Sequence, residues 1–448
     1  MTVTDTAQKT SAGRGFRAFT ARHLDQLTAR AGLPPAERLA VRAVAEVLPF
    51  RTNNYVVDEL IDWSAAPDDP IYRLTFPQKD MLPEEDVDHI AGLLRRDAPR
   101  REIQQAAHRV RMRLNPHPAG QLRLNRPVVD GHVLEGVQHK YRETVLFFPR
   151  QGQTCHAYCS YCFRWAQFVG EPDLRMAADD DGVQELVDYL LAHPEVTNVL
   201  ITGGDAMIMS ATVLRRYVEP LLALDQLESV RVGTKALAFW PRKFVTDPDA
   251  ADLLALFEQV VRSGKNLALM AHFSHLRELE TPIAEQAVSR IRSTGAVIRT
   301  QAPLIRSIND SALVWESMWR RQVRLGMVPY YMFVERDTGP ADYFAVPLAR
   351  GHEIFRDAYA SVSGLARTVR GPSMSTTAGK VCVDGVVEVA GRKVFALHLI
   401  QARNPELVGR PFYAEYDPAA VWLSDLKPAF SDRFPLEESP GAAVPVCQ

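Results

Sequence analysis

The 448-residue sequence predicts an α/β protein built on a partial (β/α)6 barrel. Short apolar segments alternate with amphipathic segments through the middle of the chain, a pattern typical of parallel βαβ units. About six such units are present, fewer than the eight of a closed barrel. Because chemistry in such folds gathers at the C-terminal ends of the strands, polar motifs at those positions are the first candidates for a functional site.

The sequence divides into four parts. Residues 1–15 are rich in Thr, Ser and Ala and are expected to form a disordered tail. Residues 16–135 carry Leu, Ala and Val at helical spacing, which predicts a helical region serving as a cap or an oligomer contact. Residues 136–370 hold the partial barrel. Residues 371–448 are rich in strand and turn signals and are expected to form a small element that closes over the barrel.

The individual elements follow from the same patterns. The expected barrel strands are 145–148, 199–202, 230–233, 267–272, 297–301 and 328–334. The expected helices between them are 182–192, 211–222, 250–263, 283–293 and 311–325. In the C-terminal part, strands are expected at 381–383, 386–389 and 394–400.

The composition is that of an ordinary globular protein, with 46% hydrophobic and 24% charged residues. A net charge of −2 gives no reason to expect nucleic acid or an anionic membrane as a partner. No segment has the length and apolarity of a membrane span, and the N-terminus lacks the apolar core of a signal peptide. Five cysteines, three of them clustered, argue against a disulfide scaffold and favour a reducing cytoplasm.

Three of the five cysteines, Cys155, Cys159 and Cys162, follow the spacing C-x3-C-x2-C. Clustered thiolates are the ligands that iron–sulfur clusters select. Three thiolates leave one iron of a [4Fe–4S] cluster without a protein ligand, which suggests that a small molecule binds and reacts there. The rival interpretation is half of a zinc site, since Cys159 and Cys162 form a C-x2-C pair. A structural zinc site needs a second pair, and Cys382 is isolated in the sequence.

A second motif, Gly203-Gly204-Asp205, follows a predicted strand about forty residues later. Adjacent glycines allow a ligand to approach the backbone closely, and a neighbouring carboxylate can hold an ammonium group. Two histidines, His272 and His275, lie at the end of another predicted strand. A histidine in that place is often structural, so these two carry less weight.

Together these motifs resemble the radical S-adenosylmethionine superfamily and, more closely, the lysine 2,3-aminomutase family. The resemblance runs from about residue 70 to residue 400. Further motifs that carry it, in order, are His139-Lys-Tyr141, Val232-Gly-Thr-Lys235, Ala271-His-Phe-Ser-His275, Leu304-Ile-Arg-Ser-Ile-Asn-Asp310 and Ala378-Gly-Lys380.

The resemblance implies that Cys155, Cys159 and Cys162 ligate the cluster. Its open iron would chelate the amino and carboxylate groups of S-adenosylmethionine, and one-electron reduction from a donor such as flavodoxin or ferredoxin would yield a 5′-deoxyadenosyl radical.

Five further residues would hold S-adenosylmethionine. The resemblance implies that Gly203, Gly204 and Asp205 contact its methionine amino group. Lys235 stands where the family usually has an arginine that reaches the carboxylate of S-adenosylmethionine. A lysine there is also a cation and can pair with the same carboxylate. His272 would lie near the adenosine.

The resemblance also implies a second cofactor and a substrate site. Lys380 matches the lysine that binds pyridoxal 5′-phosphate as an internal aldimine, and Arg164 matches the arginine that clamps the substrate carboxylate. Asp310 matches one of two aspartates that hold the distal ammonium of lysine. The expected reaction moves an amino group between C2 and C3 of an amino acid, in a protein that forms a homo-oligomer.

Two departures from the family pattern are present. The second substrate aspartate is replaced by Ser373, which argues against lysine itself and leaves Asp310 to favour another basic or hydrogen-bonding side chain. The two arginines that hold the cofactor phosphate are replaced by Lys140 and Thr144, with Arg142 close enough in sequence to act jointly with Lys140. These departures sustain the alternative of a dehydratase, deaminase, epimerase or oxidase with the same radical chemistry and no pyridoxal phosphate. A non-catalytic iron–sulfur or zinc protein is the third hypothesis, and the Gly203-Gly204-Asp205 motif argues against it.

Overall fold

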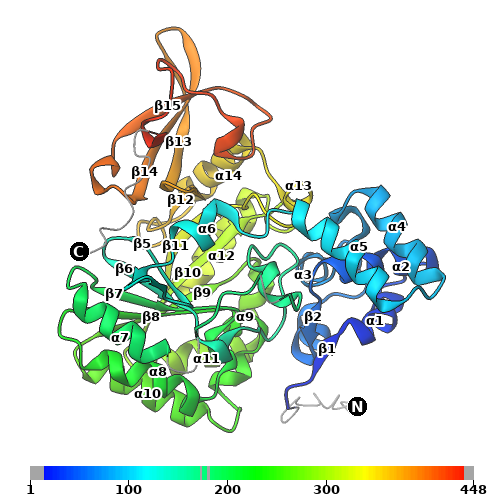
Figure 1. The fold of residues 1–448 in the computed structure, drawn as a ribbon, viewed down its shortest axis with the longest axis horizontal. Coiled ribbons are helices and arrows are strands. Elements are labelled where there is room, and N and C mark those ends of the chain that lie inside the picture. Colours follow the sequence, from blue (N-terminus) through cyan, green and yellow to red (C-terminus); the bar gives the residue numbers. More distant parts are fainter. Residues whose placement is uncertain (1–14, 172–173, 179–181, 438–448) are drawn as a thin grey trace, which may run out of the picture.

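The computed structural model describes residues 15–171, 174–178 and 182–437 (Figure 1). The expected disordered tail therefore lies outside the described residues, apart from Gly15. Within the described part of the chain, no helix is long and apolar enough to cross a membrane.

The centre of the molecule is an eleven-stranded mixed sheet with the strand order β15-β14-β13-β12-β11-β10-β9-β8-β7-β6-β5. Neighbours from β6 to β12 are parallel and follow one another in chain order. The strands are β5 (Val137–Tyr141), β6 (Thr144–Phe147), β7 (Asn198–Ile201), β8 (Ser229–Thr234), β9 (Asn266–His272), β10 (Val297–Leu304), β11 (Val328–Val334), β12 (Arg370–Ser375), β13 (Gly379–Val389), β14 (Arg392–Ala402) and β15 (Pro411–Glu415). The α/β class is confirmed, and each of the six expected barrel strands is present.

Helices follow the parallel strands as the alternating pattern predicts. The longer ones are α7 (Gly182–Ala192), α8 (Ala211–Leu222), α10 (Ala250–Arg262), α11 (Pro282–Ser293), α12 (Ala312–Arg324) and α14 (Leu348–Ala360). Two of them begin at a side-chain cap: Ser210 accepts from the Val213 amide before α8, and Thr281 accepts from the Ala284 amide before α11. Their apolar faces pack on the outer side of the sheet, where Val230, Val232 and Leu269 belong to the main hydrophobic core. The opposite side of the sheet, called the inner side below, carries the side chains that alternate with these apolar residues, such as Arg231 between Val230 and Val232.

The N-terminal region is helical, as expected. It contains α1 (Leu24–Arg30), α2 (Pro35–Val47), α3 (Pro70–Thr75), α4 (Glu84–Arg95) and α5 (Arg100–Arg113), together with the short pair β1 (Ala18–Thr20) and β2 (Arg51–Asn53). In Figure 1 these helices lie at one side of the sheet. Their buried side chains belong to the same hydrophobic core as β5 to β10, so the region is packed onto the sheet.

The C-terminal part continues the central sheet. The strand β12, which was not expected, pairs parallel with β11 and antiparallel with β13, and β13 to β15 extend the sheet as antiparallel hairpins. The two strands expected at 381–383 and 386–389 are one strand, β13. The Asp384-Gly385 sequence resembles a turn, but pairing with β14 continues through it with only a shift in register. The long β13–β14 hairpin projects from the body of the molecule (Figure 1).

Candidate functional site

The three clustered cysteines lie in the loop between β6 and α7, at the C-terminal end of β6. Burial raises the pKa of the Cys155 thiol well above its usual value, and nearby Asp205 and the other two thiols raise it further. Burial also raises the pKa of Cys159 to about 12 and that of Cys162 to about 11. The three thiols are therefore protonated near neutral pH in the protein alone, and binding iron would displace their protons. Three soft donors in one loop are the kind of ligand set that a cluster uses, although their sulfur atoms are not all within 4.8 Å of one another in this structure.

The N-terminal region holds the cysteine loop through backbone groups. The Tyr158 amide donates to the Arg51 carbonyl, and the Ser160 amide donates to the Leu74 carbonyl, both at 2.8 Å. The Asn53 side chain donates to the carbonyl of His156 at 3.2 Å. The sequence had predicted only a cap or an oligomer contact for this region. In the structure it shapes the candidate cluster loop.

The glycine pair approaches the backbone of the cysteine loop. A Cβ on Gly204 would lie 2.4 Å from the Thr154 carbonyl oxygen, and one on Gly203, where φ is +150°, would lie 2.9 Å from the Gly152 carbonyl oxygen. The Gly204 amide donates to Gly152, and the Asp205 amide donates to Thr154, directly before Cys155. The absence of side chains thus lets the end of β7 run against the loop that carries the cysteines.

The Asp205 carboxylate is saturated by groups of the protein itself. One oxygen accepts from the Thr234 hydroxyl at 2.7 Å and the Met207 amide at 2.9 Å, and the other accepts from the Lys235 amide at 2.8 Å. Burial raises the pKa of Asp205, and these hydrogen bonds oppose the rise. Its visible role is to join the ends of β7 and β8. The predicted contact with an ammonium group stays a prediction.

Lys235 forms a buried ion pair that the sequence did not suggest. Its Nζ lies 2.8 Å from Oε1 of the fully buried Glu278 and 3.2 Å from the Ser274 hydroxyl. Glu278 also accepts from the amides of Ser274 and His275. His275 precedes a short helix (Leu276–Leu279), and Glu278 is the third residue of that helix. This capping-box spacing is the sequence signal that could have drawn attention to Glu278. Lys235 is therefore held at the C-terminal ends of β8 and β9 whether or not it contacts a ligand.

His272 lies at the end of β9, and its Nε2 is 2.6 Å from the side-chain nitrogen of Gln301. Burial lowers the pKa of His272 to about 3, with the charges of Lys235 and Arg164 adding to the effect. His272 is thus neutral at physiological pH. His275 instead caps the following short helix through its Nδ1.

Arg164 is half-buried and lies two residues after the last cysteine of the loop. Its guanidinium donates to the Thr202 hydroxyl at 2.7 Å and the Gly203 carbonyl at 2.6 Å, and lies 4.8 Å from the Phe148 ring centre. Burial lowers its pKa to about 10, while the Cys162 thiol opposes that shift. No carboxylate pairs with Arg164 in the described part of the chain, so it is a cation available to an anionic ligand.

Lys380 lies near the start of β13, with its Nζ 2.8 Å from Oε1 of Gln401. The same Nζ is 4.6 Å from the ring centre of Tyr331 and 5.5 Å from that of Tyr141. Burial lowers the pKa of Lys380 to about 7, and the charges of Arg231 and Arg370 lower it further. A substantial fraction of its amine is neutral near pH 7, as a Schiff-base lysine requires.

The two residues expected to hold the cofactor phosphate lie apart. Lys140 is half-buried and donates to the Thr376 carbonyl, and burial of its amine with the neighbouring charges of Arg336 and Arg403 lowers its pKa well below its usual value. Arg142, by contrast, is exposed in the turn between β5 and β6. The expected joint action of Lys140 and Arg142 is thus not assembled, because a turn position directs Arg142 to solvent.

The two positions expected to select the substrate differ in environment. Asp310 is exposed just beyond β10, and its carboxylate has no hydrogen bond or ion pair within the described residues. The preceding Asn309 is fully buried and donates to the carbonyls of Ser274 and Pro303, which fixes this segment. Ser373 is fully buried in β12, and its hydroxyl has no partner.

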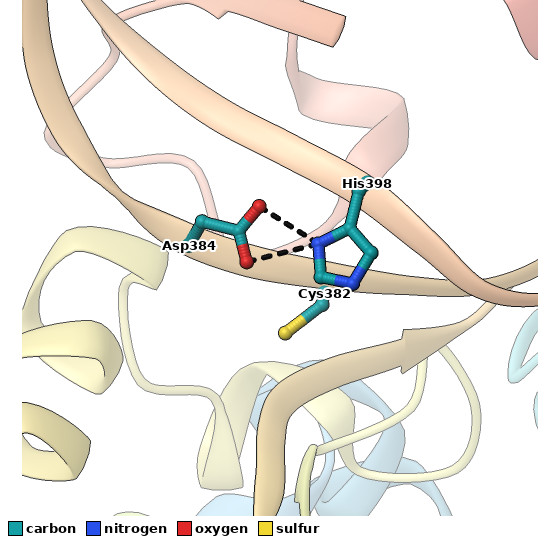
Figure 2. Close-up of side chains that lie close together, drawn as sticks. All are labelled: Cys382, Asp384 and His398. Atoms are coloured by element: carbon teal, nitrogen blue, oxygen red, sulfur yellow. Dashed lines mark hydrogen bonds and ion pairs between the residues drawn. The ribbon is translucent and has the colours of Figure 1, made fainter. Parts of the chain in front are cut away.

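A separate group of metal-ligand side chains lies on the β13–β14 hairpin (Figure 2). Among the described residues, Cys382, Asp384 and His398 form the group whose ligand atoms all lie within 4.8 Å of one another. His398 Nδ1 is 2.7 Å and 2.9 Å from the two Asp384 oxygens, and Cys382 lies directly across from His398. Burial and the Asp384 charge raise the pKa of Cys382 to about 12. Cys382 is buried as expected, but it is not isolated.

A three-cysteine loop that runs against a glycine pair is the arrangement expected of the radical S-adenosylmethionine class. No family model matches the sequence. A putative L-lysine 2,3-aminomutase from Aquifex aeolicus is 31% identical over 393 residues, covering 88% of this chain and 91% of that protein. The chain therefore belongs to the lysine 2,3-aminomutase family.

More distant relatives match a smaller region. The L-lysine 2,3-aminomutase of Clostridium subterminale is 26% identical over 229 residues, and the glutamate 2,3-aminomutase of Clostridioides difficile is 26% identical over 212 residues. These matches cover 51% of the first protein and 47% of the second, so the chain spans about half the length of each. Among solved structures, a radical SAM methyltransferase from Sphaerobacter thermophilus overlaps 52% of this chain and 68% of its own, with 16% identity and a TM-score of 0.37.

Enzymes of this family use a [4Fe–4S] cluster, S-adenosylmethionine and pyridoxal 5′-phosphate. The residues present fit the first and third of these groups most directly. The thiols of Cys155, Cys159 and Cys162 supply the donor set of a cluster with one open iron. The half-buried amine of Lys380, with a pKa of about 7 and cations around it, suits a phosphorylated aldehyde.

Proposed function

We propose that this protein is a radical S-adenosylmethionine aminomutase that moves an amino group between C2 and C3 of an amino acid. The observation that carries the proposal is the half-buried Lys380 amine, which lies between the rings of Tyr331 and Tyr141 and has a pKa lowered to about 7. The cysteine loop follows β6 of the same sheet. The cluster and S-adenosylmethionine would supply a radical that abstracts hydrogen from the substrate, and pyridoxal phosphate would carry the migrating amino group.

The shape of the sheet supports this arrangement. Lys380 lies on β13, yet its amine faces the rings of Tyr331 on β11 and Tyr141 on β5, and β5 is at the far edge of the sheet. Contact between such distant strands requires a strongly curled sheet, and we infer a partial barrel with Lys380 inside it. Such curvature would place the lysine and the cysteine loop around one interior space.

Within this space the residues have separable tasks. Cys155, Cys159 and Cys162 bind the cluster. Arg164 offers a bidentate guanidinium to the substrate carboxylate, since it is half-buried and donates to neutral acceptors only. Lys380 would hold pyridoxal phosphate through its aldehyde, and that cofactor would supply the group to which the substrate amine binds. Because His272 is neutral at physiological pH, it can accept or donate a hydrogen bond beside the adenosine without adding charge.

The proposed substrate is a basic amino acid other than lysine. Asp310 supports this choice because its carboxylate has no hydrogen bond or ion pair within the described residues. It follows Asn309, which donates to the carbonyl of Ser274, and the Ser274 hydroxyl lies 3.2 Å from the Lys235 amine. Ser373 offers a hydroxyl in place of a second carboxylate, which weakens selection for a terminal ammonium. We further propose a cytoplasmic homo-oligomer that receives its electron from flavodoxin or ferredoxin.

The test is anaerobic incubation with pyridoxal phosphate, borohydride reduction and peptide mass spectrometry across Lys380. A phosphopyridoxyl adduct on Lys380, absent from Lys380→Ala, is the expected result. A second candidate, a radical enzyme without pyridoxal phosphate, is favoured by Thr144 and Ser373, which replace family residues. Cleavage of S-adenosylmethionine with no adduct on Lys380 would select this second candidate.

A further inference from the structure

Three arginines converge on one pair of tyrosines on the inner side of the sheet. They are Arg231 of β8, Arg299 of β10 and Arg370 of β12. The Arg299 guanidinium carbon lies 5.2 Å from the ring centre of Tyr330, and that of Arg370 lies 4.4 Å from the centres of both Tyr330 and Tyr331. Burial lowers the pKa of Arg231, and the charges of Arg299 and Arg370 contribute to this shift. The three cations are therefore close enough to repel one another.

These three cations have no anionic partner in the described part of the chain. Arg231 donates to the side-chain oxygen of Asn198 at a long 3.4 Å, and the guanidinium groups of Arg299 and Arg370 lie over tyrosine rings. Like charges gathered on an inner surface are unfavourable unless an anion joins them. All three are partly exposed, so a ligand can reach them.

The arginine group lies next to Lys380. The Lys380 amine is 4.6 Å from the ring centre of Tyr331, the same ring that Arg370 covers, and Arg231 and Arg370 act on its charge. An anionic group bound by the arginines would therefore sit within a small ligand's length of the reactive amine.

A second group of cations, near Lys140, donates mainly to backbone carbonyls. Lys140 donates to the Thr376 carbonyl, and Arg336 donates to the Ser375 carbonyl at 3.3 Å. Arg403 donates to the carbonyls of Thr377 and Leu124 and to the Asn125 side chain. Lys140 and Arg403 thus hold loops in place, while Arg336 keeps a buried Nε without a partner. The arginine group differs in that three guanidinium groups gather around one pair of tyrosines.

We propose that Arg231, Arg299 and Arg370 form the site that binds the phosphate of pyridoxal 5′-phosphate in this protein. The proposal rests on the proposed function. It assigns the cations that bind the cofactor phosphate, since Thr144 replaces one of the two arginines that do so in the family. Guanidinium groups suit the task because they bind phosphate in a bidentate manner and keep their charge.

The experiment compares pyridoxal phosphate with pyridoxal, which has the same aldehyde but no phosphate. Binding of each is followed by absorbance of the lysine adduct, and the site is located by borohydride reduction and mass spectrometry. The wild-type protein should prefer pyridoxal phosphate. Arg299→Gln and Arg370→Gln should each reduce that preference about tenfold, since each removes a charge-assisted contact. Labelling of Lys380 by pyridoxal should remain, which also shows that the variants are folded.

Matched controls separate the outcomes. Arg320→Gln changes an exposed arginine of α12 that pairs with Glu316, and it should leave the preference unchanged. An unaltered preference in Arg299→Gln and Arg370→Gln, with a loss in Lys140→Met instead, would overturn the assignment while leaving Lys380 as the aldehyde site. No label on Lys380 from either aldehyde would overturn the proposed function and this inference together.

Discussion

Asn53 and His156, separated by 103 positions in the sequence, are joined by a hydrogen bond of 3.2 Å from the Asn53 side chain to the His156 carbonyl. The same amide donates to the Phe239 carbonyl at 2.9 Å, and its oxygen accepts from the amides of Tyr55 and Val56. One fully buried side chain thus links the N-terminal region, the cysteine loop and the segment after β8.

The first prediction follows from this link. Asn53→Ala leaves two buried carbonyls without their donor, at a cost of about 1–3 kcal/mol for each. The protein should still fold but should retain less iron after anaerobic reconstitution, because the loop loses its support. Iron and sulfide analysis with circular dichroism checks this. Asn54→Ala, which removes bonds only to Arg17 and Gly15, is the control. Equal iron content in the two variants would contradict the supporting role.

A second prediction concerns the glycine pair. In Gly204→Ala the new Cβ would lie 2.4 Å from the Thr154 carbonyl oxygen, so the backbone before Cys155 must move. We expect loss of the bound cluster, measured by its visible absorbance and by EPR after reduction. Gly92→Ala in α4 adds a Cβ in open space and should leave the cluster unchanged. A normal cluster signal in Gly204→Ala would show that the loop tolerates displacement.

The third prediction separates the cysteines. Cys159→Ala should abolish formation of 5′-deoxyadenosine from S-adenosylmethionine, because two thiolates do not hold the cluster in its reactive position. Cys382→Ser should leave 5′-deoxyadenosine formation and iron content unchanged, since Cys382 lies with Asp384 and His398 on the hairpin. Retained product with Cys159→Ala would remove the cluster assignment.

A fourth prediction is a pH dependence of adduct formation at Lys380. The neutral amine attacks the aldehyde, and the pKa of Lys380 is about 7, so the rate should rise from about pH 6 to about pH 8 and then level. Arg231, Arg370, Tyr331, Tyr141 and Gln401 face this amine. Arg370→Gln removes one of the repelling charges and should shift the midpoint upward. Stopped-flow absorbance across this range measures both. A midpoint near pH 10 in the wild type would mean that the amine is solvated.

The fifth prediction addresses the substrate. Asp310→Ala should raise KM for a basic amino acid about tenfold, because one charge-assisted contact is lost, and should have little effect on kcat. Assays of arginine, ornithine and lysine in parallel measure the effect. Glu316→Ala, on the outer surface of α12, is the control. An unchanged KM in Asp310→Ala would place the distal group of the substrate elsewhere.

Several features of the site could be predicted from local sequence alone. Cys155, Cys159 and Cys162 lie in one loop because three residues within eight positions cannot separate far. The cysteines follow β6, and Gly203-Gly204 follows β7. Both strands could be recognised as short apolar segments, because a buried strand needs apolar side chains. Lys380 was a candidate for Schiff-base chemistry only through the resemblance to the family, and its role stays a prediction.

Other features were outside the reach of local patterns. The sequence placed Arg142 beside Lys140, but the turn between β5 and β6 exposes it. Asp205 was expected to meet a ligand, and the structure shows its oxygens held by Thr234, Met207 and Lys235. Glu278 was missed because a buried ion pair with Lys235 depends on how β8 and β9 align.

The sequence by itself determined the α/β class, the order of the parallel strands and the chemical kind of the cysteine loop, because these depend on residues that are neighbours in the chain. Only the tertiary structure decided that Arg231, Arg299 and Arg370 meet around Tyr330 and Tyr331, and that Tyr141 faces Lys380. Those contacts join six strands: β5, β8, β10, β11, β12 and β13. Helices pack on the outer side of the sheet, so these side chains meet on its inner side. The environment of Lys380 is thus set by contacts between strands that lie far apart in the sheet, which no short segment of sequence encodes.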